Sequence, residues 1–539
     1  MSISHLLSRL ALPVIALSLL TSSLQARFVN YADLPKTLPF HEAVDKLIKD
    51  SKDKDALAVI KAASDAGDKD AQFAYAFALQ NAYGGLEAPK DKPGALIEEA
   101  KALYKKAADA GHPSALSNLG LLKLATGEDV KTSVALIEDA ANAGNARARI
   151  TMGEMYLEGV GVAKDPEMAV RWLQRAQEAE PSEATFLLAR IQEGANNHEA
   201  ALAGFRKAAE SQYLPAIVYL GNKMLTGQGV KADLDEARKW FTKAVEAGAT
   251  GAKVNLGIIA ETEAVIEKSK GESADQAKVT ESLKKALDLY NEAAALKVPD
   301  AYNKIGFFYE NGLGVDKDEA KAAEQYKLGA DAGQASSLYR LALMNEEGRG
   351  VKEKNEAEAL NLLYTAARGG LPAAQLALGE RYRAGKSGLQ QDPVAAQAWF
   401  ERAAQAGDVN AQLQLGNMYE RGETGAQNFK AASELYLEAA KKNSPVAMFQ
   451  LADMMEKGRG MTKDYIKAYG FLLACTKMLP ADDNLGKQAA EKLASLKKDM
   501  TADDHAKGDE FFKQLTGQTN APTQTGAPKT KPKSKPKSK

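Results

Sequence analysis

The sequence has one cysteine, Cys475, among its 539 residues, so it cannot contain an internal disulfide framework. Its five histidines stand singly, without the spacing of metal ligands on one helix. The 70 basic and 71 acidic residues nearly cancel, so the chain lacks the cationic surplus of a nucleic-acid-binding protein. We therefore expect no disulfide scaffold, no metal site and no nucleic-acid partner.

Familiar catalytic motifs are also missing. The sequence has no G-x-S-x-G elbow, no P-loop and no H-E-x-x-H helix. The S-x-x-K matches at Ser282–Lys285 and Ser495–Lys498 lie in ordinary amphipathic patterns. Gly-x-Gly loops could cradle a phosphate, but they recur at one place in a repeated unit, which favours a structural role. We predict a protein that is not an enzyme and needs no cofactor.

Residues 143–178 show the unit that the chain repeats. Gly153 and Tyr156 fall on one face of a first helical pattern, which Gly159 ends. Asp165 and Pro166 then open a second pattern as an N-cap and a proline at the first helical position. The two patterns predict a helical hairpin whose face of small and aromatic residues cannot be buried alone.

This unit recurs about every 36 residues, within the range typical of solenoids. The small residue of the first helix recurs as Ala76, Gly120, Gly153, Ala189, Gly221, Gly257, Gly306, Ala342, Gly379, Gly416 and Ala452. The large residue of the second helix recurs as Tyr104, Ile137, Trp172, Phe205, Trp240, Tyr290, Tyr326, Leu363, Trp399, Tyr436 and Phe471. The sequence therefore predicts an all-α solenoid of about eleven helical hairpins with capping helices at both ends.

The amino-terminal segment has the pattern of a secretory signal peptide over residues 1–26. Arg9 precedes an apolar run from Leu10 to Leu20, which is shorter than the apolar segment that a transmembrane helix needs. Cleavage is expected after Ala26, with Ser23 as a second site, and an uncleaved anchor is the alternative. We expect a periplasmic or secreted protein of a bacterial envelope, with no transmembrane span after cleavage.

The remaining boundaries follow the repeat pattern. We expect a lead-in and N-terminal capping helices over 27–63, the solenoid over 64–479 and C-terminal capping helices over 480–517. An insertion at 258–282 either extends both helices of its hairpin or forms a polar flap. Residues 518–539 lack apolar periodicity and are predicted to be disordered.

Several stretches resemble Sel1-like repeats, which are relatives of the tetratricopeptide repeat. The resemblance rests on ALSNLG, ARITMGEMYLEGVGV, AYNKIGFFYENGLGV and AQLQLGNMYERGE, and covers Ala66 to Leu479. The loops of the fourth, sixth and tenth units depart from the pattern. The chain is similar to secreted or periplasmic bacterial members, and the resemblance implies a right-handed superhelix that serves as an adaptor for proteins or peptides.

Two isolated reactive residues fit structural positions in this repeat. His112 lies at the turn between units, where other units carry Asn145 or Asp408, so we interpret it as a turn residue. Cys475 lies where other units carry alanine, so we expect a buried and inert thiol. A lone cysteine also separates the chain from the cysteine-rich Sel1-like proteins, and weakens the case for their proposed penicillin-binding activity.

A candidate partner-binding groove follows from the tetratricopeptide relationship, in which the first helix of each hairpin lines the inner groove. In the middle units, the positions one residue after the small residue and one turn before it are apolar, and the position four residues after it is acidic, so we expect an apolar strip with an acidic border there. The strip comprises Ile258, Phe307, Tyr339 and Leu343, and the border comprises Glu261, Glu310 and Glu346. Such a groove suits a peptide with apolar anchors and basic flanks. The alternative is that the apolar residues fill gaps between hairpins.

The carboxy-terminal tail is a second candidate site. Its cationic residues are Lys529, Lys531, Lys533, Lys535, Lys537 and Lys539. Without these six and Arg9, 63 of the 70 basic residues remain against 71 acidic ones, so the rest carries a charge of −8. The tail could hold an anionic envelope polymer or lipid headgroups. It could equally be a solubilising spacer or contact the acidic body of the protein itself.

The sequence therefore favours a non-enzymatic protein–protein interaction scaffold in the bacterial cell envelope. The first alternative is an envelope protein that binds glycan or peptidoglycan, with the groove aromatics as stacking platforms. The second is a penicillin-binding or hydrolase activity on the same solenoid, which would need a nucleophile and a base from different repeats.

Overall fold

The computed structural model describes residues 53–81, 86, 92, 94–480 and 482–516. The predicted signal peptide, the lead-in up to residue 52 and the Lys/Pro-rich tail lie outside them. All regular structure in the described residues is helical, which confirms the all-α prediction. The chain divides into two compact units, which meet in sequence between Ile259 and Ala260.

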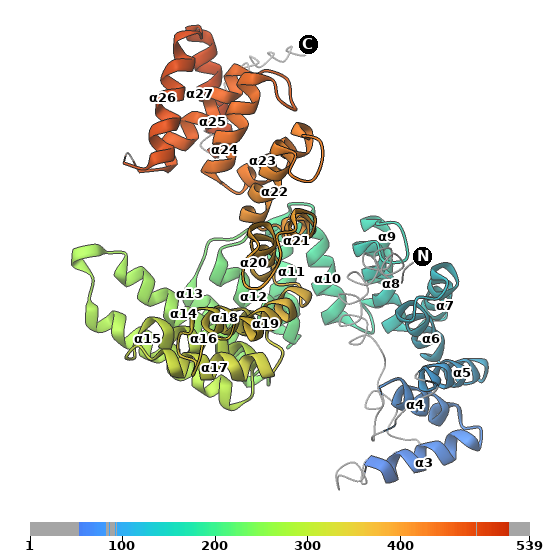
Figure 1. The fold of residues 1–539 in the computed structure, drawn as a ribbon. Coiled ribbons are helices and arrows are strands. Elements are labelled where there is room, and N and C mark those ends of the chain that lie inside the picture. Colours follow the sequence, from blue (N-terminus) through green and yellow to red (C-terminus); the bar gives the residue numbers. More distant parts are fainter. Residues whose placement is uncertain (1–52, 82–85, 87–91, 93, 481, 517–539) are drawn as a thin grey trace, which may run out of the picture. The chain divides into compact units, whose positions relative to one another are not determined.

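The first unit consists of helices α3 to α13 and the first part of α14 (Figure 1). These are α3 (Asp53–Asp65), α4 (Lys69–Gln80), α5 (Ala95–Asp109), α6 (Ala115–Ala125), α7 (Val130–Asn142), α8 (Ala146–Glu158), α9 (Pro166–Ala176), α10 (Pro181–Gly194), α11 (His198–Glu210), α12 (Leu214–Thr226), α13 (Leu234–Glu246) and α14 (Ala252–Lys268). The hairpins are α4–α5, α6–α7, α8–α9, α10–α11 and α12–α13, and α3 packs against α4.

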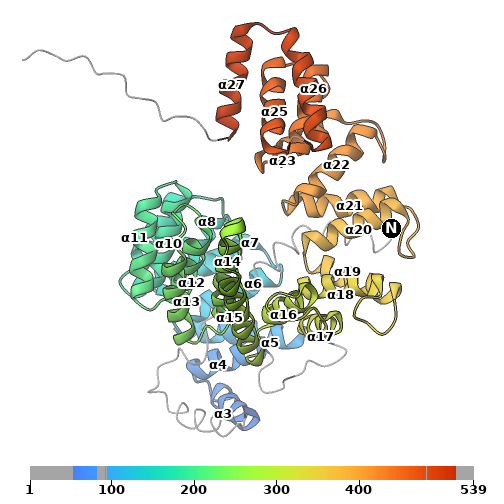
Figure 2. The same ribbon diagram turned by 90° about the vertical axis from the view of Figure 1, so that its left-hand side faces the viewer.

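The second unit contains the rest of α14, the 3₁₀ turn η3 (Gly271–Ser273) and helices α15 to α27. The helices are α15 (Gln276–Ala295), α16 (Pro299–Asn311), α17 (Glu319–Asp331), α18 (Ala335–Glu347), α19 (Glu356–Arg368), α20 (Pro372–Ala384), α21 (Pro393–Gln405), α22 (Val409–Arg421), α23 (Phe429–Lys441), α24 (Pro445–Lys457), α25 (Tyr465–Met478), α26 (Asn484–Lys498) and α27 (Ala502–Thr516). Consecutive helices pair from α16–α17 to α24–α25, and α26 and α27 both pack on α25 (Figure 2).

The sixth hairpin joins α14 to α15 and contains the predicted insertion. Both helices are longer than their counterparts, and η3 connects them. The Glu267 side chain is only 6% exposed and accepts hydrogen bonds from Lys270 Nζ at 2.7 Å and the Asp275 backbone N–H at 3.2 Å. The insertion therefore extends both helices, the first of its two expected forms. With this pair the described residues contain eleven hairpins.

The helix ends follow the expected capping chemistry. Asp165 accepts hydrogen bonds from the backbone N–H groups of Glu167 and Met168, both at 3.0 Å, and Pro166 is the first residue of α9. Gly159 ends α8 in the left-handed conformation, with φ of 77°, which glycine adopts without steric cost.

The second glycine of the Gly-x-Gly loop has a packing role. Gly350 follows α18 and lies against the backbone of Glu319, at the start of the preceding hairpin's second helix. Gly460 lies against Phe429 in the same way. A Cβ atom at either glycine would overlap the neighbouring carbonyl group, so these loops dock on the preceding hairpin because they carry no side chain.

In several hairpins the small residue of the first helix admits a large residue from the second helix. A Cβ atom on Gly306 would lie 2.7 Å from the Tyr326 ring, and one on Gly416 would lie 2.5 Å from the Tyr436 ring. Both tyrosines belong to the recurring large residues that the sequence singled out, and their rings are buried.

In three hairpins the residue that meets the small position is not the recurring tryptophan, Trp172, Trp240 or Trp399, but the residue after it. The residues that contact Gly153, Gly221 and Gly379 are Leu173, Phe241 and Phe400. A cation lies over the ring of each of these tryptophans, 4.4 to 4.6 Å from its centre. The cations are Arg175 over Trp172, Lys243 over Trp240 and Arg402 over Trp399. The crossing point selects the helical position that faces the glycine, whichever side chain is largest.

Within the described residues, no helix has the length and apolar composition that a bilayer crossing requires.

Candidate functional site

The structure divides the predicted apolar strip between the two units. Ile258 belongs to the first unit, whereas Phe307 on α16 and Tyr339 and Leu343 on α18 belong to the second. All four side chains are partly buried. The helices α16 and α18 contact each other, and the Arg340 guanidinium lies 5.5 Å from the centre of the Phe307 ring. Phe307, Tyr339 and Leu343 therefore lie on adjoining first helices of one unit.

Tyr339 serves the hairpin stack as well as the strip. It packs against the apolar cluster that includes Leu338, Ala342 and Leu363, and burial raises the pKa of its phenol. Part of its side chain stays accessible. The buried part of the Tyr339 side chain therefore fills a gap between hairpins, and its exposed part is available to a partner.

The acidic border is engaged in contacts between hairpins. Glu310 accepts a hydrogen bond from the Tyr326 hydroxyl of its own hairpin at 2.7 Å and pairs with Arg349 of the next hairpin at 3.1 Å. Glu261 does the same with Tyr290 at 2.8 Å and Lys304 at 3.0 Å. These carboxylates are 11% and 21% exposed, so their charge is balanced inside the stack.

Glu346, the third border residue, pairs with Arg381 and accepts a hydrogen bond from Ser387, both in the following hairpin. Burial alone would raise its pKa, but the hydrogen bonds from Arg381 and Ser387 outweigh burial and hold the pKa below its usual value. Related pairs between neighbouring elements are Glu193–Lys223, Glu420–Arg459 and Asp453–Lys492. The acidic border is thus part of a recurring set of inter-hairpin ion pairs.

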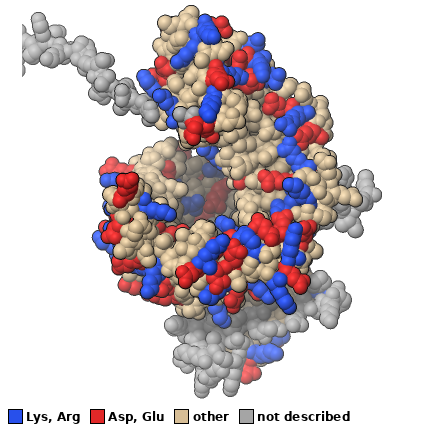
Figure 3. Space-filling view, turned by 60° about the vertical axis from the view of Figure 1, so that its left-hand side comes forward, with Lys and Arg blue, Asp and Glu red and all other residues tan. Residues whose placement is uncertain are grey.

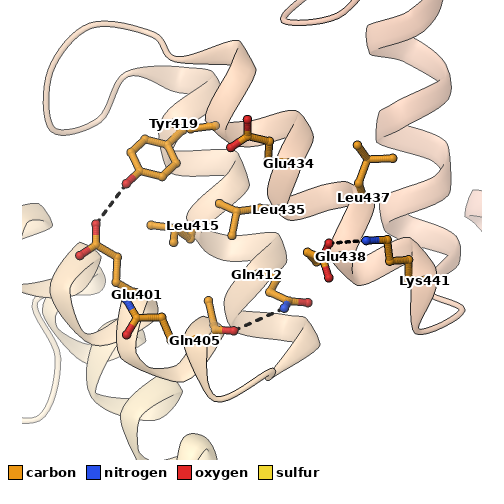
Figure 4. A pocket seen from close by; sticks show the side chains of 12 residues that line it. Glu401, Gln405, Gln412, Leu415, Tyr419, Glu434, Leu435, Leu437, Glu438 and Lys441 are labelled. Carbon is orange, nitrogen blue, oxygen red and sulfur yellow. Dashed lines mark hydrogen bonds and ion pairs between the residues drawn. The ribbon is translucent and has the colours of Figure 1, made fainter. Parts of the chain in front are cut away.

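A cleft that sequence reasoning did not identify lies between α21 and α23, over α22 (Figure 4). We call it the α22 cleft, and its volume is about 580 Å³. Its lining residues are Glu401, Ala404, Gln405, Gln412, Leu415, Tyr419, Ala431, Glu434, Leu435, Leu437, Glu438 and Lys441. Three carboxylates and one ammonium group give this lining a formal charge of −2.

The two sides of the α22 cleft are held by hydrogen bonds. Figure 4 shows Tyr419 bonded to Glu401 at one side and Lys441 bonded to Glu438 at the other, at 3.1 Å and 2.6 Å. Gln412 lies between them and donates its Nε2 to the Ala404 carbonyl at 3.4 Å. Its side chain is 5% exposed, and its Oε1 has no hydrogen-bond partner among the described residues.

The side chains that flank α22 explain why this cleft is open. Glu401 directly follows Phe400, and Leu435 directly precedes Tyr436, the two residues that pack on the small positions. One hairpin earlier, the equivalent positions carry Tyr364 and Trp399, whose ring centres lie 6.2 Å apart. Aromatic rings meet there, whereas a carboxylate and a shorter leucine leave space beside α22.

A second cleft occupies the equivalent place over α18, with a volume of about 480 Å³. Lys327 and Leu362 occupy its two flanking positions, again a charged residue and a leucine. Its lining also includes Glu324, Asp331 and Glu358. Both clefts therefore share a sequence pattern. A charged residue follows the buried large residue of one second helix, and a leucine precedes the buried large residue of the next second helix.

Surface charge does not single out any other region of the visible face. Lys and Arg are interspersed with Asp and Glu in Figure 3, without a large field of one sign. The Lys/Pro-rich tail, with all six of its predicted binding lysines, lies outside the described residues. No group of three His, Cys, Asp or Glu residues suited to holding a metal ion occurs in the part of the chain that is described.

His112 and Cys475 both have structural contacts. His112 lies in the turn between α5 and α6, stacks on Phe73 with ring centres 4.1 Å apart and accepts a hydrogen bond from the Ser114 N–H. Burial lowers the pKa of its imidazole to about 4. Cys475 is fully buried, donates to the Pro445 carbonyl and has a pKa raised by burial to about 12. The turn and buried-thiol predictions are confirmed.

Comparison with protein families matches the Sel1 repeat across more than half of the chain. The matched segments are residues 69–112, 146–179, 214–248, 274–298, 299–334, 335–371, 372–408, 409–444 and 445–474. The hairpins α6–α7 and α10–α11 lie largely between matched segments but keep the same helical pairing.

Two curated relatives are similar over part of their length. An uncharacterized protein of Neisseria meningitidis is 28% identical over 247 residues, which are 41% of this chain and 51% of the relative. Chitin synthase regulatory factor 3 of Schizosaccharomyces pombe is 28% identical over 257 residues, which are 44% of this chain and 26% of the relative. The chain thus spans about half of one relative and a quarter of the other.

Solved structures to which the chain is similar include a protective antigen of uropathogenic Escherichia coli, described as displaying an SLR fold. It is 23% identical, with coverage of 88% of this chain and 99% of that chain and a TM-score of 0.42. A Sel1 repeat protein from Oxalobacter formigenes is 25% identical, with coverage of 66% and 90% and a TM-score of 0.40.

Proposed function

The chain belongs to the Sel1 repeat family, and on that premise we propose that it is a non-enzymatic scaffold that binds a protein partner through a peptide segment. Sel1 solenoids are typically protein–protein interaction scaffolds, because stacked hairpins expose an extended surface that tolerates residue exchange. The proposed site is the strip of Phe307, Tyr339 and Leu343.

The observation that carries this proposal is the accessibility of three large apolar side chains on two contacting helices. Phe307, Tyr339 and Leu343 are only partly buried, although α16 and α18 pack together. Aromatic residues such as Phe307 and Tyr339 are enriched at the centres of protein interfaces, and Leu343 extends the apolar surface beside them. The neighbouring acidic border is neutralised by Lys304, Arg349 and Arg381, so apolar anchors rather than basic flanks should dominate affinity.

The proposed place of action is the bacterial envelope, in the periplasm or outside the cell. The support is the charged and apolar pattern of residues 1–26, which resembles a cleavable export signal. In that setting the lysines between 529 and 539 would contact an anionic envelope polymer through screened electrostatic attraction.

The alternative function is binding of envelope glycan. It is favoured by the aromatic faces of Phe307 and Tyr339, which could stack on sugar rings. Peptide anchoring and sugar stacking use the same side chains, so the two functions differ in what is captured and not in where it binds.

The test is affinity capture from the native envelope with purified residues 27–539, followed by mass spectrometry. The variant Phe307→Asp with Leu343→Asp should lose a specific protein that wild type retains. Val394→Asp with Val446→Asp is the control, because these valines are 68% and 42% exposed and lie outside the strip. Circular dichroism must show that both variants are folded.

Retention of every captured protein by the strip variant would contradict the groove assignment. Binding to purified peptidoglycan that the strip variant alone loses, with no protein captured, would replace the peptide partner by a glycan. A protein lost only when residues 518–539 are removed would transfer the site to the tail.

A further inference from the structure

The α22 cleft combines features that a purely structural gap between hairpins does not need. Leu415 forms an apolar floor and is 4% exposed, whereas Leu435 is only partly buried. Around these leucines stand Glu401, Glu434 and Glu438, of which Glu434 and Glu438 are exposed. An apolar pocket with an acidic rim is complementary to a large apolar side chain beside a cation.

A buried acceptor at the base of the cleft supports a ligand independently of the rim. Gln412 is almost fully buried, its Nε2 is engaged with Ala404, and its Oε1 lacks a partner among the described residues. A buried acceptor without a donor is unfavourable, and an N–H group from a bound peptide would satisfy it. Gln375 has the same unpartnered oxygen, but there Tyr364 and Trp399 occupy the flanking positions.

We propose that the α22 cleft is a docking site for a peptide segment of a partner protein that carries a large apolar side chain next to lysine or arginine. The apolar side chain packs between Leu415 and Leu435, the cation pairs with Glu434 or Glu438, and a peptide N–H donates to Gln412 Oε1. The cleft over α18, with acidic Glu324 and Glu358 in its lining, provides a second place of related chemistry.

The occupant is a partner and not the chain's own tail. The tail is cationic, but its residues 518–539 include no Leu, Ile, Val, Met or aromatic side chain that could fill the apolar floor. The cleft proposal depends on the scaffold function for its partner class, although it uses different residues from the strip of Phe307, Tyr339 and Leu343.

The test selects a random peptide library against the full mature chain and measures binding of the enriched peptides by fluorescence polarisation. We expect peptides in which an apolar residue adjoins lysine or arginine. Glu434→Lys with Glu438→Lys should weaken them about tenfold or more, since each charge pair becomes repulsive. The control is Glu199→Lys with Glu210→Lys, which reverses two exposed glutamates on α11 and should leave binding unchanged.

A second variant tests the apolar floor with side chains that the fold already accommodates. Glu401→Tyr with Leu435→Trp copies the pair Tyr364 and Trp399 of the preceding hairpin, so it should fold and close the cleft. Gln412→Leu should also weaken the peptides, whereas Gln375→Leu should not. Enrichment without basic residues, or equal binding to the wild type and the closed variant, would overturn the proposal.

The strip variant separates this proposal from the scaffold function. If Phe307→Asp with Leu343→Asp abolishes peptide binding and the cleft variants do not, the strip is supported and the cleft proposal is overturned. Peptides lost only with the cleft variants would support the cleft. Tighter peptide binding after removal of residues 518–539 would show that the tail occupies the cleft, which would also overturn the proposal.

Discussion

At the scale of single residues, the small positions of the first helices are determined by contact and not by backbone conformation. Gly416 has no positive φ, yet a Cβ atom there would lie 2.5 Å from the Tyr436 ring. Gly194, at the end of α10, has no atom within 4 Å of its hypothetical Cβ. The two glycines therefore respond oppositely to the same added methyl group.

We predict that Gly416→Ala destabilises the protein and Gly194→Ala does not. Overpacking at Gly416 should cost about 1–3 kcal/mol, which exceeds the gain of about 1 kcal/mol in helix propensity. Guanidinium unfolding followed by circular dichroism measures the shift in midpoint. An unchanged or raised midpoint for Gly416→Ala would show that Tyr436 moves aside easily.

A second residue-scale prediction concerns acid stability. The folded-state pKa of Glu346 lies below its usual value, because hydrogen bonds from Arg381 and Ser387 outweigh the effect of burial. Such a carboxylate stabilises the fold above its unfolded pKa of about 4.3, and this contribution is lost as the pH falls through the folded pKa. The free energy of unfolding should therefore decline as the pH falls below about 4.3.

The check is urea unfolding of wild type and Glu346→Gln across the acid range. The variant should be less stable at neutral pH and should lose less stability on acidification. Glu434→Gln, at an exposed carboxylate, is the control. Parallel pH curves for wild type and Glu346→Gln would exclude a role of this pair in the acid response.

At the scale of elements, one buried carboxylate closes the extended hairpin of α14 and α15. Glu267 bonds Lys270 and the Asp275 N–H and lies 3.3 Å from Lys278. These groups bring the end of α14, η3 and the start of α15 together. Glu267 therefore makes three of the contacts that hold the connection between these two unusually long helices.

We predict that Glu267→Ala frays this end of the hairpin. Backbone amides from Ala264 to Thr280 should exchange hydrogen faster, because the Asp275 N–H and two lysines lose their shared acceptor. Hydrogen–deuterium exchange with mass spectrometry measures the effect. Glu281→Ala removes an exposed carboxylate from α15 and should leave exchange near wild type. Equal exchange in both variants would assign the turn's stability to helix packing.

At the scale of the whole molecule, the envelope proposal rests on residues 1–26. Fused to a reporter that is active only after export, these residues should give activity in a bacterial host. Arg9→Glu with Leu17→Arg should abolish export, because it removes the positive charge before the apolar run and interrupts that run.

The mature protein should begin at Arg27 or Leu24, as read by mass spectrometry of the exported chain. A retained amino terminus with membrane association would favour the uncleaved anchor. Reporter activity equal to that of a fusion without residues 1–26 would contradict the export signal altogether.

The sequence by itself determined the repeat and its chemistry. Caps such as Asp165 and loop glycines such as Gly159 act within a few residues of chain, and small residues such as Gly306 recur at the same place in each unit, although Gly306 contacts Tyr326 of the following helix. Their spacing therefore revealed the hairpin period, the all-α class and the resemblance to the family. The handedness, the domain boundaries at the ends and the role of the tail stay predictions.

Tertiary structure alone decided what the exposed faces do. The carboxylates of Glu261, Glu310 and Glu346 are paired by residues of the next hairpin, at distances along the chain that vary with loop length. Only packing showed that Phe400, not Trp399, faces Gly379. The α22 cleft likewise arises where Leu435 and Glu401, on different helices, fail to fill a space, because a cavity depends on side chains meeting in three dimensions.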